Sequence, residues 1–295
     1  MNRSTHRLAR LLSGVFLVVS LGSLSACGYG SYRGIPSPGV ELERPSFVTV
    51  SVPSSVDGHA GYDLLVGVTE VTQRQWRDVM GTEPSFARCE NCPVEMVSWY
   101  DAAAYANALS EREGLTPCYT LSACTEARPY GRGDPGNRYS HQAGLACEAV
   151  TSIGPSCNGY RLPSRAEWEV YGGVAAVAES RRAADRYATF YSYRRRITRQ
   201  VASHRPNEHG LYDTLGNVEE WLDVRAEAPA RTAASRQRVA LRVWFLAAGT
   251  CFRSTRGELY LRHYHSELGS WARDCAGFRL VRTAPVETAA EGGAG

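Results

Sequence analysis

The sequence predicts one folded domain that combines helices with strands, contains long loops and is held together by disulfide bonds. Three capped helix starts and three strand signals lie between about residues 46 and 283. Two further stretches, 115–160 and 180–212, are long for loops unless they are functional or covalently pinned. The chain has nine cysteines, four of them in the first of these stretches, and its N-terminus indicates export to an oxidising compartment.

The first 26 residues resemble a bacterial lipoprotein signal peptide. Three arginines precede an apolar run over residues 11–24, which is too short to span a membrane. Leu24-Ser-Ala-Cys27 resembles a lipobox, in which the Cys27 thiol receives the lipid. An ordinary signal peptide with Cys27 in a disulfide is the alternative. The absence of aspartate at Gly28 resembles lipoproteins sorted to the outer membrane, so we expect an outer membrane-anchored lipoprotein, periplasmic or surface-exposed.

The rest of the chain divides by composition. A Gly-, Ser- and Pro-containing segment follows the lipobox, and an Ala-, Glu- and Gly-rich tail ends the chain. We therefore expect a signal peptide (1–26), a lipidated tether (27–45), one folded domain (46–283) and a disordered tail (284–295).

The charge of the chain argues against a nucleic-acid partner. The formal net charge is +3, but removing the three arginines of the signal leaves as many basic as acidic residues. All the basic residues other than histidine are arginines, which excludes Schiff-base and phosphate-loop lysine chemistry.

Local patterns place the helices and strands. Thr72, Ser98 and Ser164 each precede a glutamine, aspartate or glutamate by three residues, which is the capping box of a helix start. Apolar and β-branched runs predict strands at 47–52, 239–245 and 278–281.

The cysteine spacings favour disulfides over metal or redox sites. Cys89-Glu-Asn-Cys92 lies between prolines in a loop, so a local disulfide is favoured over a thioredoxin-like redox pair. The spacings of the four loop cysteines do not match a zinc knuckle, although zinc is an alternative. Spacing alone does not fix the pairing. We expect the pairs Cys89–Cys92, Cys118–Cys157, Cys124–Cys147 and Cys251–Cys275.

One polar segment could bind calcium. Asp213 and Glu220 are seven residues apart, and Gly216 and Val218 between them can offer backbone carbonyls. A tight turn at Gly216 would bring these oxygens together, and mixed carboxylate and carbonyl ligands suit Ca²⁺. The alternative is an ordinary polar turn.

Several motifs together resemble the formylglycine-generating enzyme, or sulfatase-modifying factor, family. They occur in the family's order over about residues 62–283. The most specific are Val68-Thr-Glu-Val-Thr-Gln73, Pro93-Val-Glu-Met-Val-Ser-Trp99, Tyr160-Arg-Leu-Pro-Ser-Arg-Ala-Glu-Trp-Glu169, Leu215-Gly-Asn-Val-Glu-Glu-Trp221 and Gly277-Phe-Arg-Leu280.

The resemblance implies a single loop-rich α+β domain with a C-type-lectin-like fold. It also implies a calcium site at Asp213, Gly216, Val218 and Glu220, which strengthens the calcium prediction. The family oxidises a sulfatase cysteine with O₂ and Cu(I), held by two cysteines five residues apart. Here these two positions hold Arg253 and Glu258, so copper is not expected.

We therefore expect a lipid-anchored cell-envelope protein with a sulfatase-modifying-factor domain that is a non-catalytic binding module. Its expected partners are the membrane, through the lipid, and an envelope protein, peptide or glycan. Trp221 and Arg262 are candidates for lining the ancestral cleft, unless they are structural. The alternative is a formylglycine-generating-type oxidase that acts on a protein cysteine or related substrate through a divergent site.

Overall fold

The computed structural model describes residues 43–56, 58–86, 88–126, 142–172, 186–190, 197–226, 244–255 and 264–285 of the chain. The predicted signal peptide, Cys27, Glu258 and Arg262 lie outside these ranges. None of the helices within the ranges combines the length and apolar character that a membrane span requires.

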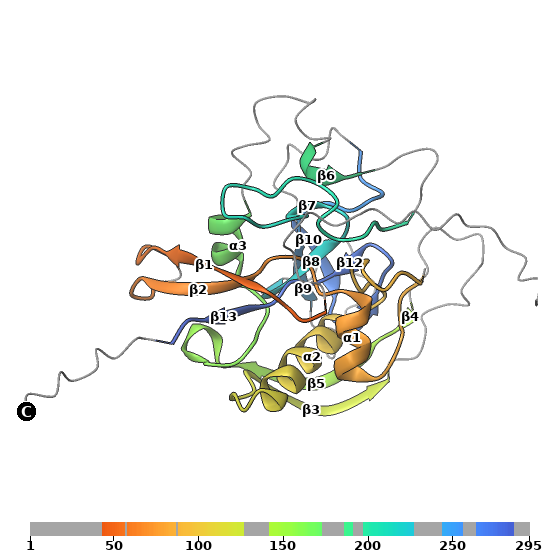
Figure 1. The fold of residues 1–295 in the computed structure, drawn as a ribbon. Coiled ribbons are helices and arrows are strands. Elements are labelled where there is room, and N and C mark those ends of the chain that lie inside the picture. The colour runs from red at the N-terminus through yellow and green to blue at the C-terminus, as the bar shows by residue number, and fades with distance from the viewer. Residues whose placement is uncertain are drawn as a thin grey trace, which may run out of the picture. The chain divides into compact units, whose positions relative to one another are not determined.

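Short strands and three helices make up the described part (Figure 1). In chain order they are β1 (Phe47–Val52), β2 (Tyr62–Gly67), α1 (Gln73–Met80), α2 (Trp99–Arg112), β3 (Tyr119–Glu126), β4 (Gln142–Ala143), β5 (Leu145–Ser152), the 3₁₀ helix η1 (Gly154–Ser156), α3 (Arg165–Tyr171), β6 (Ala188–Thr189), β7 (Leu215–Gly216), β8 (Glu219–Ala226), β9 (Trp244–Ala248), β10 (Tyr264–Leu268), β11 (Trp271–Ala272), β12 (Ala276–Gly277) and β13 (Val281–Thr283).

All three predicted helix starts are confirmed. Thr72, Ser98 and Ser164 are the N-caps of α1, α2 and α3, and each forms both hydrogen bonds of a capping box. Each N-cap oxygen accepts from the third helical N–H, which would otherwise be unsatisfied. Gly81 ends α1 in the left-handed conformation at φ 71°, where glycine is favoured.

Two larger sheets organise the strands. One has the order β1-β2-β13 and is antiparallel; the other has the order β10-β9-β8-β12, in which β12 runs parallel to β8. The predicted strand at 47–52 is β1. The predicted strand at 278–281 is wrong in its bounds, because the chain leaves the second sheet after β12 and joins the first sheet only at β13.

Part of the stretch 115–160 was expected to be a loop and instead forms strands. β3 and β5 pair antiparallel along eight-residue strands, with Cys124 directly opposite Cys147. That pair is a disulfide, and the other three are Cys89–Cys92, Cys118–Cys157 and Cys251–Cys275. The pairing agrees with the expected one, and the disulfide-stapled α+β fold class is confirmed.

Aromatic side chains fill the core between α1, α2 and the second sheet. Trp99 at the start of α2 is fully buried and stacks on Phe245 of β9, with ring centroids 3.8 Å apart. The Trp99 indole N–H donates to the Leu222 carbonyl in β8 at 2.8 Å. Trp76 of α1 stacks on Tyr105 of α2 at 5.5 Å. These contacts attach both helices to the strands that carry the polar segment.

A buried ion pair fixes α3 against the first sheet. Arg161 donates to both Glu167 carboxylate oxygens at 2.7 and 2.6 Å, and both side chains are almost fully buried. Glu167 also accepts from the Ser164 N–H and from the Tyr62 hydroxyl, each at 2.7 Å. Burial alone would raise the pKa of Glu167, but the hydrogen bonds and charge of Arg161 lower it below the usual value.

We expect Glu167→Gln to destabilise the fold by about 3–5 kcal/mol at pH 7, because it leaves the Arg161 charge buried without a counter-charge. Urea denaturation of the full chain measures this free energy of unfolding. Glu111→Gln, at an exposed position near the end of α2, is the control, with an expected change within about 0.5 kcal/mol.

The same pair predicts a pH dependence. A carboxyl whose folded-state pKa is lowered contributes stability above its unfolded pKa of about 4.3, and that contribution disappears as the pH falls through the folded pKa. The wild-type chain should therefore lose stability faster than Glu167→Gln below about pH 4. Parallel acid profiles for the two proteins would contradict this role for Glu167.

Candidate functional site: a buried carboxylate cluster and the Cys251–Cys275 position

The polar segment predicted as a calcium site begins just before β7 and ends in β8, with a tight turn between the two strands. Asp213, Gly216 and Asn217 have positive φ values of 57°, 86° and 61°. A Cβ at position 216 would lie 2.2 Å from the Thr189 carbonyl oxygen, so glycine is required where β7 pairs with β6. Asp213 is 2% exposed and Asn217 is fully buried, so the turn places polar groups in the interior.

Glu70, just before α1, holds the turn in place. Its Oε2 accepts from the Asn217 side-chain amide at 2.8 Å, and its Oε1 accepts from the Val218 N–H at 3.1 Å. Asn217 in turn accepts from the Arg199 N–H at 2.9 Å. The Glu70 side chain is fully buried. One carboxylate therefore links two motifs that lie 147 residues apart.

Glu220 in β8 is held by Arg279. The Arg279 guanidinium donates twice to Glu220 Oε1, at 2.9 and 2.7 Å, and the Trp168 indole N–H donates to Oε2 at 3.0 Å. Arg279 also donates to the carbonyls of Gly67 and Tyr212. The ion pair is buried on both sides, with side-chain exposures of 0% and 2%.

Asp213 is the incompletely satisfied member of the cluster. Its Oδ2 accepts from the Ala202 N–H at 2.7 Å. Its Oδ1 is buried and has no hydrogen-bond partner among the residues that the structure describes. An unsatisfied buried carboxylate oxygen is costly, so this atom marks a place for a further donor or a cation.

The cluster has more buried negative than positive charge. Three buried carboxylates, those of Glu70, Asp213 and Glu220, share Arg279 as their fully buried cation, with Arg199 contributing from a half-buried position. Burial raises the pKa of Asp213 to about 6. Burial, and then the Asp213 charge, raise the pKa of Glu70 well above its usual value. A divalent cation would offset the excess negative charge.

The structure brings two of the four predicted calcium ligands, Asp213 and Glu220, into this cluster. Gly216 and Val218 lie in the same turn. Glu70 and Arg279 belong to the cluster but were missed by the sequence reasoning. Glu70 lies within the recognised Val68–Gln73 motif, but only its contact with Asn217, far along the chain, shows its role.

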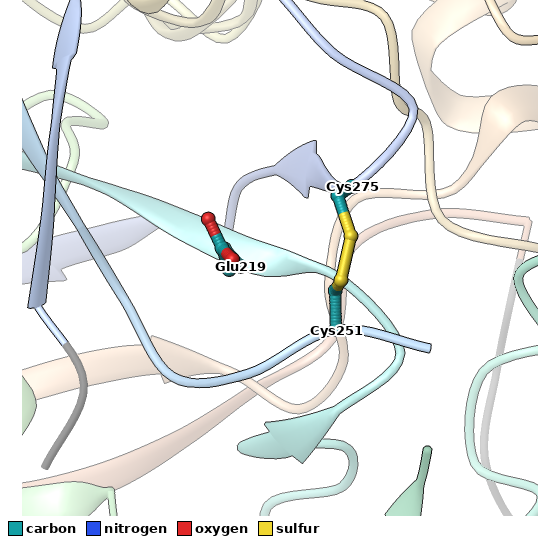
Figure 2. Close-up of side chains that lie close together, drawn as sticks. All are labelled: Glu219, Cys251 and Cys275. Atoms are coloured by element: carbon teal, nitrogen blue, oxygen red, sulfur yellow. A yellow bond between two sulfur atoms is a disulfide. The ribbon is translucent and has the colours of Figure 1, made fainter. Parts of the chain in front are cut away.

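The position of the family's copper site has a different chemistry here. Cys251 and Cys275 form a disulfide, with Cα atoms 5.6 Å apart, and Glu219 lies beside it (Figure 2). Arg253, at the first copper-cysteine position, makes a two-point ion pair with Asp274. Arg273 donates to Glu219 at 2.6 Å. A guanidinium cannot ligate Cu(I), and a disulfide has no thiolate, so these residues do not fit the copper pair.

Trp221 is in the core rather than at a cleft. It is fully buried, and its indole N–H donates to the Val97 carbonyl at 3.1 Å. The structural alternative therefore holds for this residue, because an indole that packs and hydrogen-bonds inside cannot contact a partner at the surface. The other cleft candidate, Arg262, lies outside the described residues, as do Glu258 and the lipidation candidate Cys27.

Comparisons with known proteins agree with this architecture. Residues 46–284 match the family model of the sulfatase-modifying factor enzyme 1-like domain. A relative named Chaperone protein LppX, from Paenibacillus barcinonensis, is 32% identical over 227 residues, which are 70% of this chain and 78% of that protein.

Two solved structures are similar to this fold. Treponema denticola variable protein 1 has a TM-score of 0.57 at 22% identity, over 81% of this chain and 93% of that one. CarF has a TM-score of 0.53 at 25% identity, over 76% and 87%. The motifs, the fold and the match over residues 46–284 show that the chain belongs to the sulfatase-modifying factor enzyme 1-like, or formylglycine-generating enzyme, family.

Proposed function

We propose that this protein is a lipid-anchored binding module of the cell envelope that uses the family fold without the family's copper oxidation. The observation that carries the proposal is the Arg253–Asp274 ion pair beside the Cys251–Cys275 disulfide. Copper oxidation needs two thiolates at one centre, and this chain has a cation at one of the two positions. The domain keeps its buried framework, which is sufficient to present a surface to a partner.

A polypeptide is the partner class that we favour. The relative from Paenibacillus barcinonensis is named as a chaperone protein, and it is aligned over most of both chains. Its similarity supports, for this chain, the binding of an incompletely folded or exported polypeptide. A peptide or a glycan would be recognised by different surface chemistry, and either is a distinguishable outcome of the experiments below.

The proposed binding function predicts the results of three measurements. Each uses the full chain in detergent micelles without reductant. We expect no stoichiometric Cu(I) binding in an anaerobic titration and no O₂ uptake with a cysteine-containing peptide. We also expect dose-dependent suppression of light scattering by a heat-unfolded polypeptide, because binding shields its apolar segments.

The controls separate the two functions. Micelles without protein set the background for light scattering. Tight 1:1 copper binding that Cys251→Ala abolishes, together with O₂ uptake, would establish the oxidase and reject the binding module. Unchanged light scattering combined with binding to a glycan would reject the polypeptide as the partner.

The envelope location rests on the lipobox at Leu24-Ser-Ala-Cys27. We expect the wild-type chain, expressed in a Gram-negative bacterium, to fractionate with outer membranes and to carry acyl chains on Cys27 by mass spectrometry. Cys27→Ser should remain unacylated, because serine lacks the thiol. Ser31→Ala, in the tether, is the control and should behave as wild type. An unmodified Cys27 in the wild-type protein would reject the anchor, and protease treatment of intact cells would show which side the domain faces.

The calcium proposal rests on the buried cluster. Asp213 Oδ1 has no described hydrogen-bond partner, and the buried carboxylates outnumber the buried arginine. We propose that Asp213 and Glu220, with the carbonyls of Gly216 and Val218, bind Ca²⁺ as a structural ion. Carboxylate and carbonyl oxygens are the ligands that calcium prefers. The ion would stiffen the turn between β7 and β8 and offset the excess negative charge.

Calcium should therefore raise the melting temperature of the full chain after chelation. At a hundredfold excess over its dissociation constant, a bound ligand stabilises a fold by about 2.7 kcal/mol, or about 5–10 °C for a domain of this size. Asp213→Ala should lose this shift, and Asp78→Ala, an exposed aspartate in α1, should keep it. Equal melting temperatures of the wild-type protein in chelator and in calcium would reject the site.

A further inference from the structure

The Cys89–Cys92 disulfide lies at the N-terminal end of α1. The Gln73 N–H donates to the Cys92 carbonyl, and the Arg74 N–H donates to the Glu90 carbonyl, both at 2.9 Å. The Cys89 N–H donates to the Gln73 side-chain carbonyl at 2.9 Å. The loop between the two cysteines therefore covers the first N–H groups of the helix, and the helix start holds both cysteines in place.

The two sulfur-bearing residues differ in accessibility. Cys92 is 4% exposed, whereas Cys89 is half-buried and lines a hollow whose charged residues are Arg77, Glu83, Arg88 and Glu90. An incoming thiolate can therefore approach Cys89 from the hollow, while Cys92 is protected. In thiol–disulfide exchange this asymmetry determines which sulfur is attacked and which departs.

Charged side chains and the N-terminal end of α1 surround this disulfide. The first turn of α1 contains no acidic residue, so no carboxylate there offsets the positive end of the helix dipole. Three arginines surround the loop, and three glutamates pair with them. The pairs are Arg74–Glu43, Arg74–Glu90, Arg77–Glu83, Arg77–Glu90 and Arg88–Glu83. The three glutamates balance the three arginines in formal charge, so the positive feature beside this disulfide is the N-terminal end of α1. A helix N-terminus stabilises a cysteine thiolate and makes its disulfide more oxidising.

The other three disulfides lack this combination. Cys118–Cys157 and Cys251–Cys275 are buried at both residues. Cys124 is exposed, but its disulfide joins two strands across a separation of 23 residues, and the exposed acids Glu126 and Glu148 lie on the same strands. Cys124–Cys147 is therefore a control within the same protein for an accessible cysteine that lies in a strand and not at the start of a helix.

We propose that Cys89–Cys92 is a thiol–disulfide exchange site whose substrate is a polypeptide with two cysteine thiols. A substrate thiolate attacks Cys89 Sγ, the Cys89–Cys92 bond breaks, and Cys92 leaves with the electron pair as a thiolate. The second substrate thiolate then attacks the substrate sulfur that is bonded to Cys89. The bond between that sulfur and Cys89 Sγ breaks, and Cys89 leaves as a thiolate. The substrate is oxidised to a disulfide, and Cys89–Cys92 is reduced to a dithiol. Glutathione disulfide, or another disulfide oxidant, reverses that reduction.

This exchange site is independent of the proposed function, because a small thiol can react at Cys89 without any bound partner. A Cys89→Ser/Cys92→Ser double variant should still suppress polypeptide aggregation while losing the exchange. If the wild-type protein does not suppress polypeptide aggregation, the binding module is rejected, and the proposal of an exchange site is unaffected.

The test compares the disulfides of the full chain in detergent micelles. The protein is incubated with reduced glutathione, quenched in acid and alkylated, and each pair is quantified by peptide mass spectrometry. We expect Cys89–Cys92 to be reduced at least about tenfold faster than Cys124–Cys147. When glutathione disulfide replaces reduced glutathione, the free Cys89 thiolate of Cys92→Ser should attack it, form a mixed disulfide and release one glutathione thiolate. Equal or slower reduction of Cys89–Cys92 would overturn the proposal.

Two further measurements separate exchange from a structural role. With glutathione disulfide as oxidant, the wild-type chain should accelerate disulfide formation in a reduced two-cysteine peptide, and the double variant should not. Arg88→Gln, at an exposed position, should slow reduction of Cys89–Cys92 about twofold, whereas Arg112→Gln at the end of α2 should not. No acceleration by the wild-type chain would reject the activity.

Discussion

The buried ion pair between Glu220 and Arg279 is the interaction on which the rest of the structure depends. Arg279 lies between the two sheets, where the chain leaves β12 for β13, and it donates to the carbonyls of Gly67 and Tyr212 as well as to Glu220. Trp168 of α3 donates to the other Glu220 oxygen. One guanidinium therefore joins β2, β8 and the turn before β7. A buried pair of this kind is costly to form and more costly to break, so the surrounding fold must satisfy every donor. Beside this pair, Asp213 keeps a buried oxygen without a described hydrogen-bond partner, and this oxygen is what supports the calcium proposal.

Much of the fold could be predicted because its strongest signals are local. The capping boxes at Thr72, Ser98 and Ser164 each depend on residues three positions apart, and all three are confirmed. The pairing of β3 with β5 could not be predicted in the same way, because it joins residues that are far apart in the chain, from Tyr119–Ser152 to Glu126–Leu145. Most of β3 is also exposed, so this strand has little apolar periodicity. The bounds of the strands near Gly277 were missed for a related reason. The chain passes from one sheet to the other between β12 and β13, and no local sequence pattern marks such a change of sheet.

The candidate site was predicted only in part, again for reasons of distance. Asp213 and Glu220 lie in one short segment, so their spacing indicated a shared centre. Glu70 reaches the same turn from 147 residues away, and the sequence alone does not show that contact. For Trp221 the sequence left two interpretations open, a residue that lines a cleft and a structural residue. Its indole closes the core by donating to Val97.

The chain separates two properties that the family combines, a rigid framework and a thiolate copper centre. The framework survives because its buried pairs, Arg161–Glu167 and Glu220–Arg279, do not involve the copper position. The copper position instead has a disulfide and the Arg253–Asp274 pair, and both of these join the segment just before β12 to the loop after β9. The Cys251–Cys275 disulfide can hold these segments together as a bound metal would. Its formation removes the thiolates that would bind O₂-reactive copper. If any cysteine chemistry remains in the described part of the chain, it is therefore expected at a disulfide with a cysteine that is not buried, and half-buried Cys89 meets this condition beside the N-terminal end of α1.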